Sequence, residues 1–198
     1  TYHGHLYQGS IDNQRGAAIT MIAGAAGTDG SAPGSLSNGT FSLYQYGITQ
    51  SGSGETALIS SGDVRLYQPY IKDAGGDSSL TLRANRRIYN YAASNALGIE
   101  SRVGRLDVVF NADADDNSDG FIYTRGSITT LGGDVLLYGG SSPSDAAWGY
   151  SYGVGFDNGT INAGGGDIVV RGSAFGYWDQ GAVRLQDAAL ITTGAGTI

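Results

Sequence analysis

The densest group of potential metal ligands in the sequence is the acidic stretch 111–120, which reads NADADDNSDG. It places oxygen-bearing side chains at alternate positions, Asp113, Asp115, Asn117 and Asp119. Calcium loops use this spacing because it gathers hard oxygen ligands around one ion. Ser118 and Thr124 stand where a helix–loop–helix calcium loop needs glycine and a bidentate glutamate, which excludes that form. A looser calcium site remains open, but we favour a solvated turn that needs no cofactor.

Two segments, 141–152 and 173–181, concentrate aromatic residues that could contact a ligand. They contain Trp148, Tyr150, Tyr152, Phe175, Tyr177 and Trp178. Each follows a Gly-Asp strand pattern, so we interpret both as loops inserted at equivalent corners of adjacent repeats, lying side by side. Their rings are predicted to form one cluster at an edge, suited to sugar stacking or protein contact. The alternative is that the rings fold back over the corners.

Three aspartates, Asp63, Asp134 and Asp167, each follow glycine and precede a strand pattern at one register. A row of carboxylates could bind calcium or supply a general acid and base, as in β-helical polysaccharide lyases and hydrolases. Because the residue returns with the repeat, we favour aspartates that bond nearby backbone at a recurring turn. Asn38 and Asn158 each begin an Asn-Gly-Thr glycosylation acceptor, which matters only if the source glycosylates exported proteins.

These residues are carried by a repeating unit. Residues 126–140, GSITTLGGDVLLYGG, are echoed by 159–173, GTINAGGGDIVVRGS. The same pattern returns at 57–67 and begins again at 189–198, and 79–84 and 105–110 are predicted to be intervening strands. Each unit holds short runs with alternating apolar residues, bounded by Gly, Asn, Asp or Ser, which is typical of strands. Short strands at a fixed interval of a few tens of residues predict a solenoid, because one coil cannot bury its apolar face alone.

The predicted coil has three faces. Three successive turns are preceded by Ile122, Ile128 and Val135, the next coil repeats these positions at Val154, Ile161 and Ile168, and a further coil begins with Val183 and Ile191. Strand alternation places Val135, Leu137, Ile168 and Val170 inside, with Leu136 and Val169 facing outward. We therefore predict an all-β, three-sided parallel β-helix with inserted corner loops. It forms one domain over 1–198, less regular over 1–54 and clearly repetitive over 55–198.

The stretches 78–88 and 104–113, SSLTLRANRRI and GRLDVVFNAD, resemble filamentous-haemagglutinin-type exoproteins exported by two-partner secretion. Residues 161–172 and 191–196 are similar to coils of the same family. The resemblance covers roughly 55–198 and implies a right-handed parallel β-helix, secretion through an outer-membrane partner, and a role in adhesion or related surface functions. Neither the family's secretion signature nor a toxin-like end is found, so the segment is expected to be shaft within a longer protein.

Composition excludes several partners. The chain has 18 acidic and 11 basic residues and a net charge of −7, the wrong sign for binding nucleic acid through phosphate neutralisation. No run approaches the roughly 18 apolar residues of a membrane span, so membrane insertion is not expected. The absence of cysteine excludes thiol catalysis and thiolate metal sites.

Two classes of function remain. The first is a non-enzymatic adhesin or fibrous shaft, secreted or displayed at the cell surface, for attachment or for matrix and filament building. Its partners would be glycan or protein receptors on a host or neighbouring cell, or further copies of itself. The alternative is a carbohydrate-active β-helix enzyme, a polysaccharide lyase or glycoside hydrolase, which requires carboxylates converging in a cleft.

Overall fold

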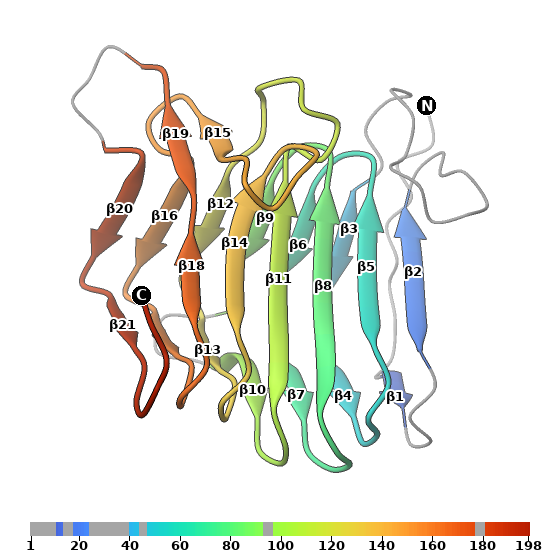
Figure 1. Ribbon diagram of the computed structural model, residues 1–198. Helices are drawn as coiled ribbons and strands as arrows, with labels where there is room; N and C mark the ends of the chain where they lie inside the picture. The colour runs from blue at the N-terminus through green and yellow to red at the C-terminus, as the bar shows by residue number, and fades with distance from the viewer. Residues whose placement is uncertain (1–10, 14–17, 24–39, 44–46, 93–96, 177–180) are drawn as a thin grey trace.

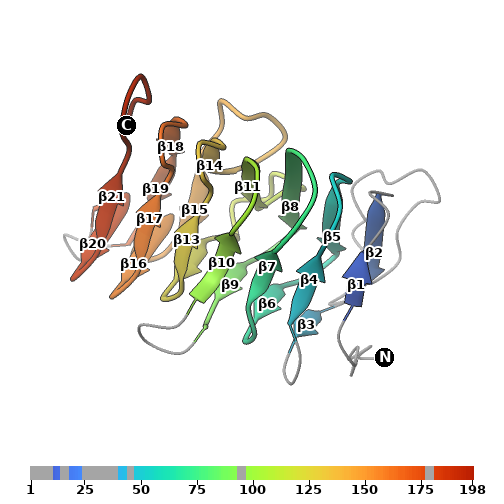
Figure 2. The same ribbon diagram turned by 90° about the horizontal axis from the view of Figure 1, so that it is seen from below.

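The computed structural model describes residues 11–13, 18–23, 40–43, 47–92, 97–176 and 181–198. These residues form strands and turns, without a helix. Three parallel sheets run along the molecule, and each coil adds one strand to each sheet (Figures 1 and 2). Successive coils wind with a right-handed sense, as parallel crossovers do. The predicted three-sided parallel β-helix is confirmed.

Strand order is the same in every complete coil: sheet A, then B, then C. Sheet A holds β1 (Ile11–Asn13), β4 (Ile48–Gln50), β7 (Tyr70–Lys72), β10 (Leu97–Ser101), β13 (Ser127–Thr129), β17 (Thr160–Asn162) and β21 (Ala189–Ile191). Sheet B holds β2 (Ile19–Ala23), β5 (Thr56–Ser60), β8 (Ser78–Ala84), β11 (Leu106–Ala112), β14 (Val135–Gly139) and β18 (Ile168–Val170). Sheet C holds β3 (Phe41–Leu43), β6 (Val64–Leu66), β9 (Ile88–Asn90), β12 (Ile122–Thr124), β16 (Val154–Asp157) and β20 (Val183–Gln186). The described parts of 1–54 thus belong to the same array.

The core is built from aliphatic columns that run from coil to coil. In sheet A, Ile99, Ile128 and Ile161 lie in register on neighbouring strands and are fully buried. Sheet C repeats this with Ile88, Ile122 and Val154. Burying one such side chain stabilises the fold by about 1.5–3 kcal/mol. Because a single coil cannot bury these faces alone, each coil depends on its neighbours for stability.

The predicted inward and outward positions of sheet B are confirmed. Val135, Leu137 and Ile168 are buried in the core, and Val170 packs against it. Leu136 and Val169 alternate with them and are only half-buried. The alternation follows from the pleat, which sends successive side chains to opposite faces.

One repeat position was predicted wrongly, because the sequence aligned Ile191 with Ile161. Leu190, rather than Ile191, pairs with Ile161 in sheet A and packs against the core. Ile191 pairs with Asn162 and is 40% exposed. Two adjacent apolar residues cannot both point inward on one strand, and only the register of the neighbouring coil decides between them.

The turns between sheets A and B bury polar groups that are satisfied by backbone. Lys72 is fully buried, and its Nζ donates hydrogen bonds to the carbonyls of Ala74 (2.9 Å) and Val103 (2.7 Å). Burial lowers the pKa of Lys72. In a later coil, Thr130 Oγ1 lies within hydrogen-bond distance of the Gly133 carbonyl in its own turn (2.6 Å) and of the Ala163 carbonyl in the next coil (3.0 Å). The buried groups therefore tie turns of successive coils together.

The corner between sheets B and C varies most in length. It takes three residues in the coils of β5 and β8, but nine between β11 and β12. The two following coils insert β15 (Ala147–Gly149) and β19 (Gly172–Ala174), which pair in parallel as a small fourth sheet, D. Figure 1 shows these longer connections above the main array. This corner therefore carries the insertions that can shape a site.

Candidate functional site

The outward side of sheet C carries a continuous set of aromatic and arginine side chains. Its central column, in register from β6 to β20, is Arg65, Tyr89, Tyr123, Gly155 and Arg184. These residues alternate with the buried residues of each strand, so their side chains point away from the core. Tyr67, Tyr91 and Phe121 flank this column at the ends of the strands.

The rings contact one another within and between coils. Tyr89 stacks on Tyr91 with ring centroids 4.8 Å apart, and Tyr91 stacks on Tyr67 at 5.2 Å. In the next coil, Phe121 meets Tyr89 edge-on at 5.5 Å. Tyr123 lies 5.8 Å from Tyr91. We call this surface the aromatic face; its rings are Tyr67, Tyr89, Tyr91, Phe121, Tyr123 and Tyr152.

Tyr152 reaches the aromatic face from the corner loop that follows β15. A Cβ added at Gly155 would lie 2.5 Å from Cε2 of Tyr152, so the ring occupies the place of the missing side chain. It stacks on Tyr123 at 6.3 Å and meets Phe121 edge-on at 5.7 Å. Gly155 is therefore needed for the loop to extend the aromatic face by one coil.

A groove of about 450 Å³ opens on this part of the face. Its lining comprises Tyr89, Tyr91, Phe121, Tyr123, Tyr152, Gly155, Phe156, Asp157 and Arg184. Small-molecule sites commonly have volumes of about 300–1,000 Å³ and combine apolar walls with a few polar groups. The volume of the groove thus falls within the range of small-molecule sites, and its lining combines aromatic rings with polar groups.

Asp157 is the carboxylate of this groove, and its oxygens are engaged by neighbours. Tyr123 donates its hydroxyl to Asp157 Oδ2 at 2.8 Å, and Arg125 Nε lies 3.6 Å from the same oxygen. Asn158 Nδ2 donates to Oδ1 at 2.6 Å. The carboxylate is therefore held as a fixed acceptor by these three partners.

Burial governs the ionisation of the tyrosines. Burial raises the pKa of Tyr91 to about 12, and burial together with the hydrogen bond to Asp157 raises that of Tyr123 to about 12. Burial also raises the pKa of Tyr152. These phenols stay protonated at neutral pH, so they can donate and accept hydrogen bonds beside their apolar rings.

Arginines border the rings and pair with acids. The Arg65 guanidinium lies 5.4 Å from the Tyr89 centroid and 2.5 Å from Asp63. Arg87 lies 5.1 Å from the centroid of Phe121, and its Nη2 is 3.4 Å from Asp119. Cation–π contacts of this kind favour rings that stay in place. The order of the aromatic face is therefore reinforced by charge as well as by stacking.

The predicted single cluster of loop aromatics is divided between two places. Sheet D brings the two inserted loops side by side, as expected. Phe175 lies 6.2 Å from Trp148 and 5.7 Å from Tyr150, and Phe175 and Tyr150 are more than half exposed. Tyr152 instead joins the aromatic face, because Gly155 leaves room for its ring. The remaining members, Tyr177 and Trp178, lie outside the described residues.

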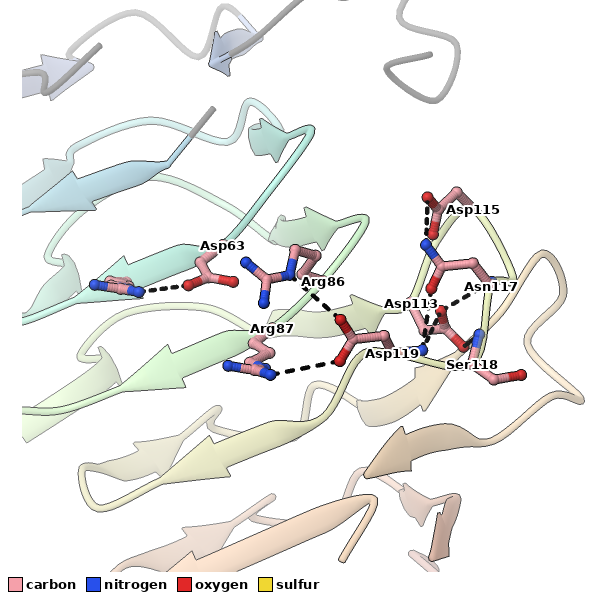
Figure 3. A network of polar contacts seen from close by, with 9 residues as sticks. Asp63, Arg86, Arg87, Asp113, Asp115, Asn117, Ser118 and Asp119 are labelled. Atoms are coloured by element: carbon pink, nitrogen blue, oxygen red, sulfur yellow. Dashed lines mark hydrogen bonds and ion pairs between the residues drawn. The ribbon is translucent and has the colours of Figure 1, made fainter. Parts of the chain in front are cut away.

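The acidic loop directs its oxygens to different partners (Figure 3). The buried Asp113 carboxylate accepts backbone N–H groups of Asn117, Ser118 and Asp119 at 3.1–3.3 Å. Asp115 accepts from the Asn117 amide at 3.0 Å. Asp119 turns to two arginines, Arg86 at 3.5 Å and Arg87 at 3.4 Å. Within the described ranges no group of three acidic, histidine or cysteine side chains is arranged to hold a metal. The solvated turn favoured from the sequence, and the alternative of a looser calcium site at Asp113, Asp115, Asn117 and Asp119, both stay predictions.

The predicted aspartate row exists, with one member replaced. Asp134 Oδ1 accepts the backbone N–H of Asp167 at 2.9 Å, and Asp107 Oδ1 does the same for Asp134 at 3.0 Å. Asp167 in turn accepts the N–H of Thr197 at 2.8 Å. Each carboxylate therefore satisfies backbone in the next coil. Asp63 was wrongly placed in this row, since it precedes a strand of sheet C and pairs with Arg65.

The two glycosylation acceptors are only partly placed. Asn158 is exposed in the turn between β16 and β17, at a positive φ of 60°. Asn38 lies outside the described residues. Modification of either asparagine stays a prediction.

The aromatic face was missed from the sequence, although a signal for it exists. Tyr89 and Tyr91 stand two apart around a polar core position. Phe121 and Tyr123 stand two apart around an inward Ile. Once Ile122 is assigned to the core, alternation sends Phe121 and Tyr123 outward. The contribution of Tyr152 has no such signal, because it depends on the path of a loop.

The fold and the site together define a class: a three-sided parallel β-helix with an aromatic groove on one outer face. No protein-family model, curated protein or solved structure matches the chain. In the described part of the chain, no helix is long and apolar enough to span a membrane. Function must therefore be inferred from the chain's own surfaces.

Proposed function

We propose that this chain is a non-enzymatic adhesive shaft segment of a secreted or surface-displayed protein, which attaches to glycan-bearing surfaces through its aromatic face. The observation that carries this proposal is the set of six rings ordered across four coils outside the core. Half-buried tyrosines present apolar rings and protonated hydroxyls together, a combination suited to sugars. The interior is filled by aliphatic side chains and a few buried rings, so binding falls to outer faces and loops.

The placement of acids favours attachment over catalysis. Glycoside hydrolases use two carboxylates about 5–9.5 Å apart across the scissile bond. The groove is lined by one carboxylate, Asp157, and that group is held by Tyr123, Arg125 and Asn158. The regularly placed acids Asp107, Asp134 and Asp167 serve backbone at turns. Among the described residues, the acids thus follow the arrangement expected of a shaft.

A cell-attachment assay tests the proposal. Surfaces coated with the chain would be challenged with a panel of bacterial, plant and mammalian cells, and with a glycan array. The variant Tyr91→Ala/Tyr123→Ala removes two rings of the groove and should lower attachment at least several-fold. The matched control, Val109→Ala/Leu136→Ala, truncates two outward residues of sheet B and should attach like the wild type. Both variants are first checked by thermal melting.

Equal attachment by wild type and the double tyrosine variant would overturn the proposal. Loss of attachment only in a Trp148→Ala variant would transfer the contact surface to the inserted loops, as the sequence first suggested.

A further inference from the structure

The arginines on and beside sheet C differ in whether they form an ion pair, and this difference indicates what kind of ligand the groove could bind. Arg65 pairs with Asp63, Arg87 with Asp119, and Arg125 with Asp157. Arg184 lies in the same surface but is exposed, and among the described residues it makes no ion pair. Its guanidinium contacts the neutral amide oxygen of Gln186 and lies 6.0 Å from the Tyr152 centroid.

We infer that the groove binds an acidic oligosaccharide, with the carboxylate of a sugar acid on Arg184 and the sugar ring against Tyr123 and Tyr152. This inference rests on the proposed function and adds the chemical class of its ligand. A guanidinium presents a planar fork that matches a carboxylate in two parallel hydrogen bonds. Arg184 lines the groove, so an anion bound there remains beside the aromatic walls.

Charge complementarity selects this ligand over the alternatives. A cationic ligand would meet Arg184 without gaining Asp157, whose carboxylate already faces Arg125. A neutral sugar would leave the charge of Arg184 unused. The chain as a whole carries a net charge of −7, so long-range forces repel polyanions and an acidic ligand needs a local cation to bind. Arg184 supplies that cation at the groove.

The hydroxyl groups of Tyr123 and Tyr152 add hydrogen-bonding positions for the sugar. Tyr123 already donates its proton to Asp157, which leaves its oxygen as an acceptor for a sugar hydroxyl. The pKa of Tyr152 is raised by burial, so its hydroxyl keeps its proton at neutral pH. Together with Arg184, these groups would fix the orientation of one ring, while the remaining rings of the aromatic face support its neighbours.

The test compares acidic oligosaccharides with the same oligosaccharides after the carboxylates are capped as methyl esters. Oligogalacturonate, oligomannuronate and sialyllactose serve as probes, each titrated calorimetrically into the chain. At least one acidic probe should bind tenfold or more tightly than its ester. Arg184→Gln should remove that preference, Arg184→Lys should keep part of it, and raised salt should weaken it. Arg171→Gln is the control, because Arg171 is exposed and follows sheet B, away from the groove.

The inference is overturned if no acidic probe binds, if the esters bind as tightly as the acids, or if Arg184→Gln keeps the preference. In each of these cases the proposal that the aromatic face mediates attachment still holds, provided that the Tyr91→Ala/Tyr123→Ala variant loses attachment. If that variant also attaches normally, both the surface and the ligand class are wrong.

Discussion

Sheets B and C follow the same coils but present different outer faces. On sheet B the central outward column is Ala57, Thr81, Val109, Leu136 and Val169. The corresponding column on sheet C contains arginine, tyrosine and a glycine covered by Tyr152. Inward, both sheets stack buried aliphatic residues, as at Leu82 and Ile88. The core positions therefore specify the coil, while the outward positions are free to specify what the coil contacts.

The largest effect should come from the inward side of sheet B. Phe110→Ala removes a fully buried ring from the core and should cost about 3–5 kcal/mol of unfolding free energy. Val109→Ala, at the adjacent outward position, should cost well under half as much. Denaturant unfolding of both variants provides the measurement. Similar losses would mean that inward and outward positions do not divide stability as described.

A smaller loss of stability is expected from a substitution at Gly155, where sheet C leaves room for the Tyr152 ring. Gly155→Ala places a methyl group against the Tyr152 ring and should cost about 1–3 kcal/mol, the range for overpacking. It should also shift the ring resonances of Tyr152 in NMR spectra. Gly181→Ala is the control, because the nearest atom to its added Cβ is 3.4 Å away. An unchanged Tyr152 environment in the Gly155 variant would refute the role given to this glycine.

Each aspartate of the row at the edge of sheet B should contribute a smaller amount to the unfolding free energy. Asp134→Ala leaves the backbone N–H of Asp167 without its 2.9 Å acceptor and should cost about 0.5–1.5 kcal/mol. Asp134→Asn retains an acceptor oxygen and should recover most of that loss. Urea unfolding curves distinguish the two variants. If both lose equal stability, the charge rather than the hydrogen bond matters at this turn.

A further expected effect concerns the pH dependence of stability at the corner between sheets B and C. Burial raises the pKa of Asp113 from 3.8 to about 6, although three backbone N–H donors oppose the shift. Between pH 3.8 and about 6, the folded chain therefore binds a proton at Asp113 more tightly than the unfolded chain does. The resulting stabilisation is full below about pH 3.8 and is lost as pH rises through 6.

Asp113→Asn removes this titration. The stability of the wild type relative to the variant should therefore rise when the pH is lowered from 7.5 to 4.5. Urea midpoints of both proteins at the two pH values give the comparison. A difference that stays constant, or that changes in the opposite direction, would contradict the raised pKa.

Much of the fold could be predicted from sequence because alternation and the interval between repeats are local and periodic. Ile122, Ile128 and Val135 identify the three faces without any structural information. The register of Leu190 could not be predicted, because two adjacent apolar residues satisfy alternation equally well until the neighbouring coil is present. Asp63 was misplaced for a related reason: a Gly-Asp turn precedes strands of sheet B and of sheet C.

The site was less predictable than the fold. The aromatic residues concentrated at 141–152 and 173–181 predicted a contact surface on the loops. The aromatic face is instead assembled from three strands and their flanks, with one or two rings from each coil. Such a surface becomes visible only after the coils are stacked in register. The position of Tyr152 depends further on a loop path that no periodicity encodes.

Hydroxyl-radical footprinting with a glycan selected by the array would locate the surface that the ligand covers. Oxidation of each aromatic residue is measured by mass spectrometry with and without the bound glycan. We expect protection of Tyr91, Tyr123 and Tyr152, with little change at Trp148 or at Tyr138 on sheet B. Protection confined to Trp148, or the same protection on every face, would contradict the assignment of the aromatic face as the contact surface.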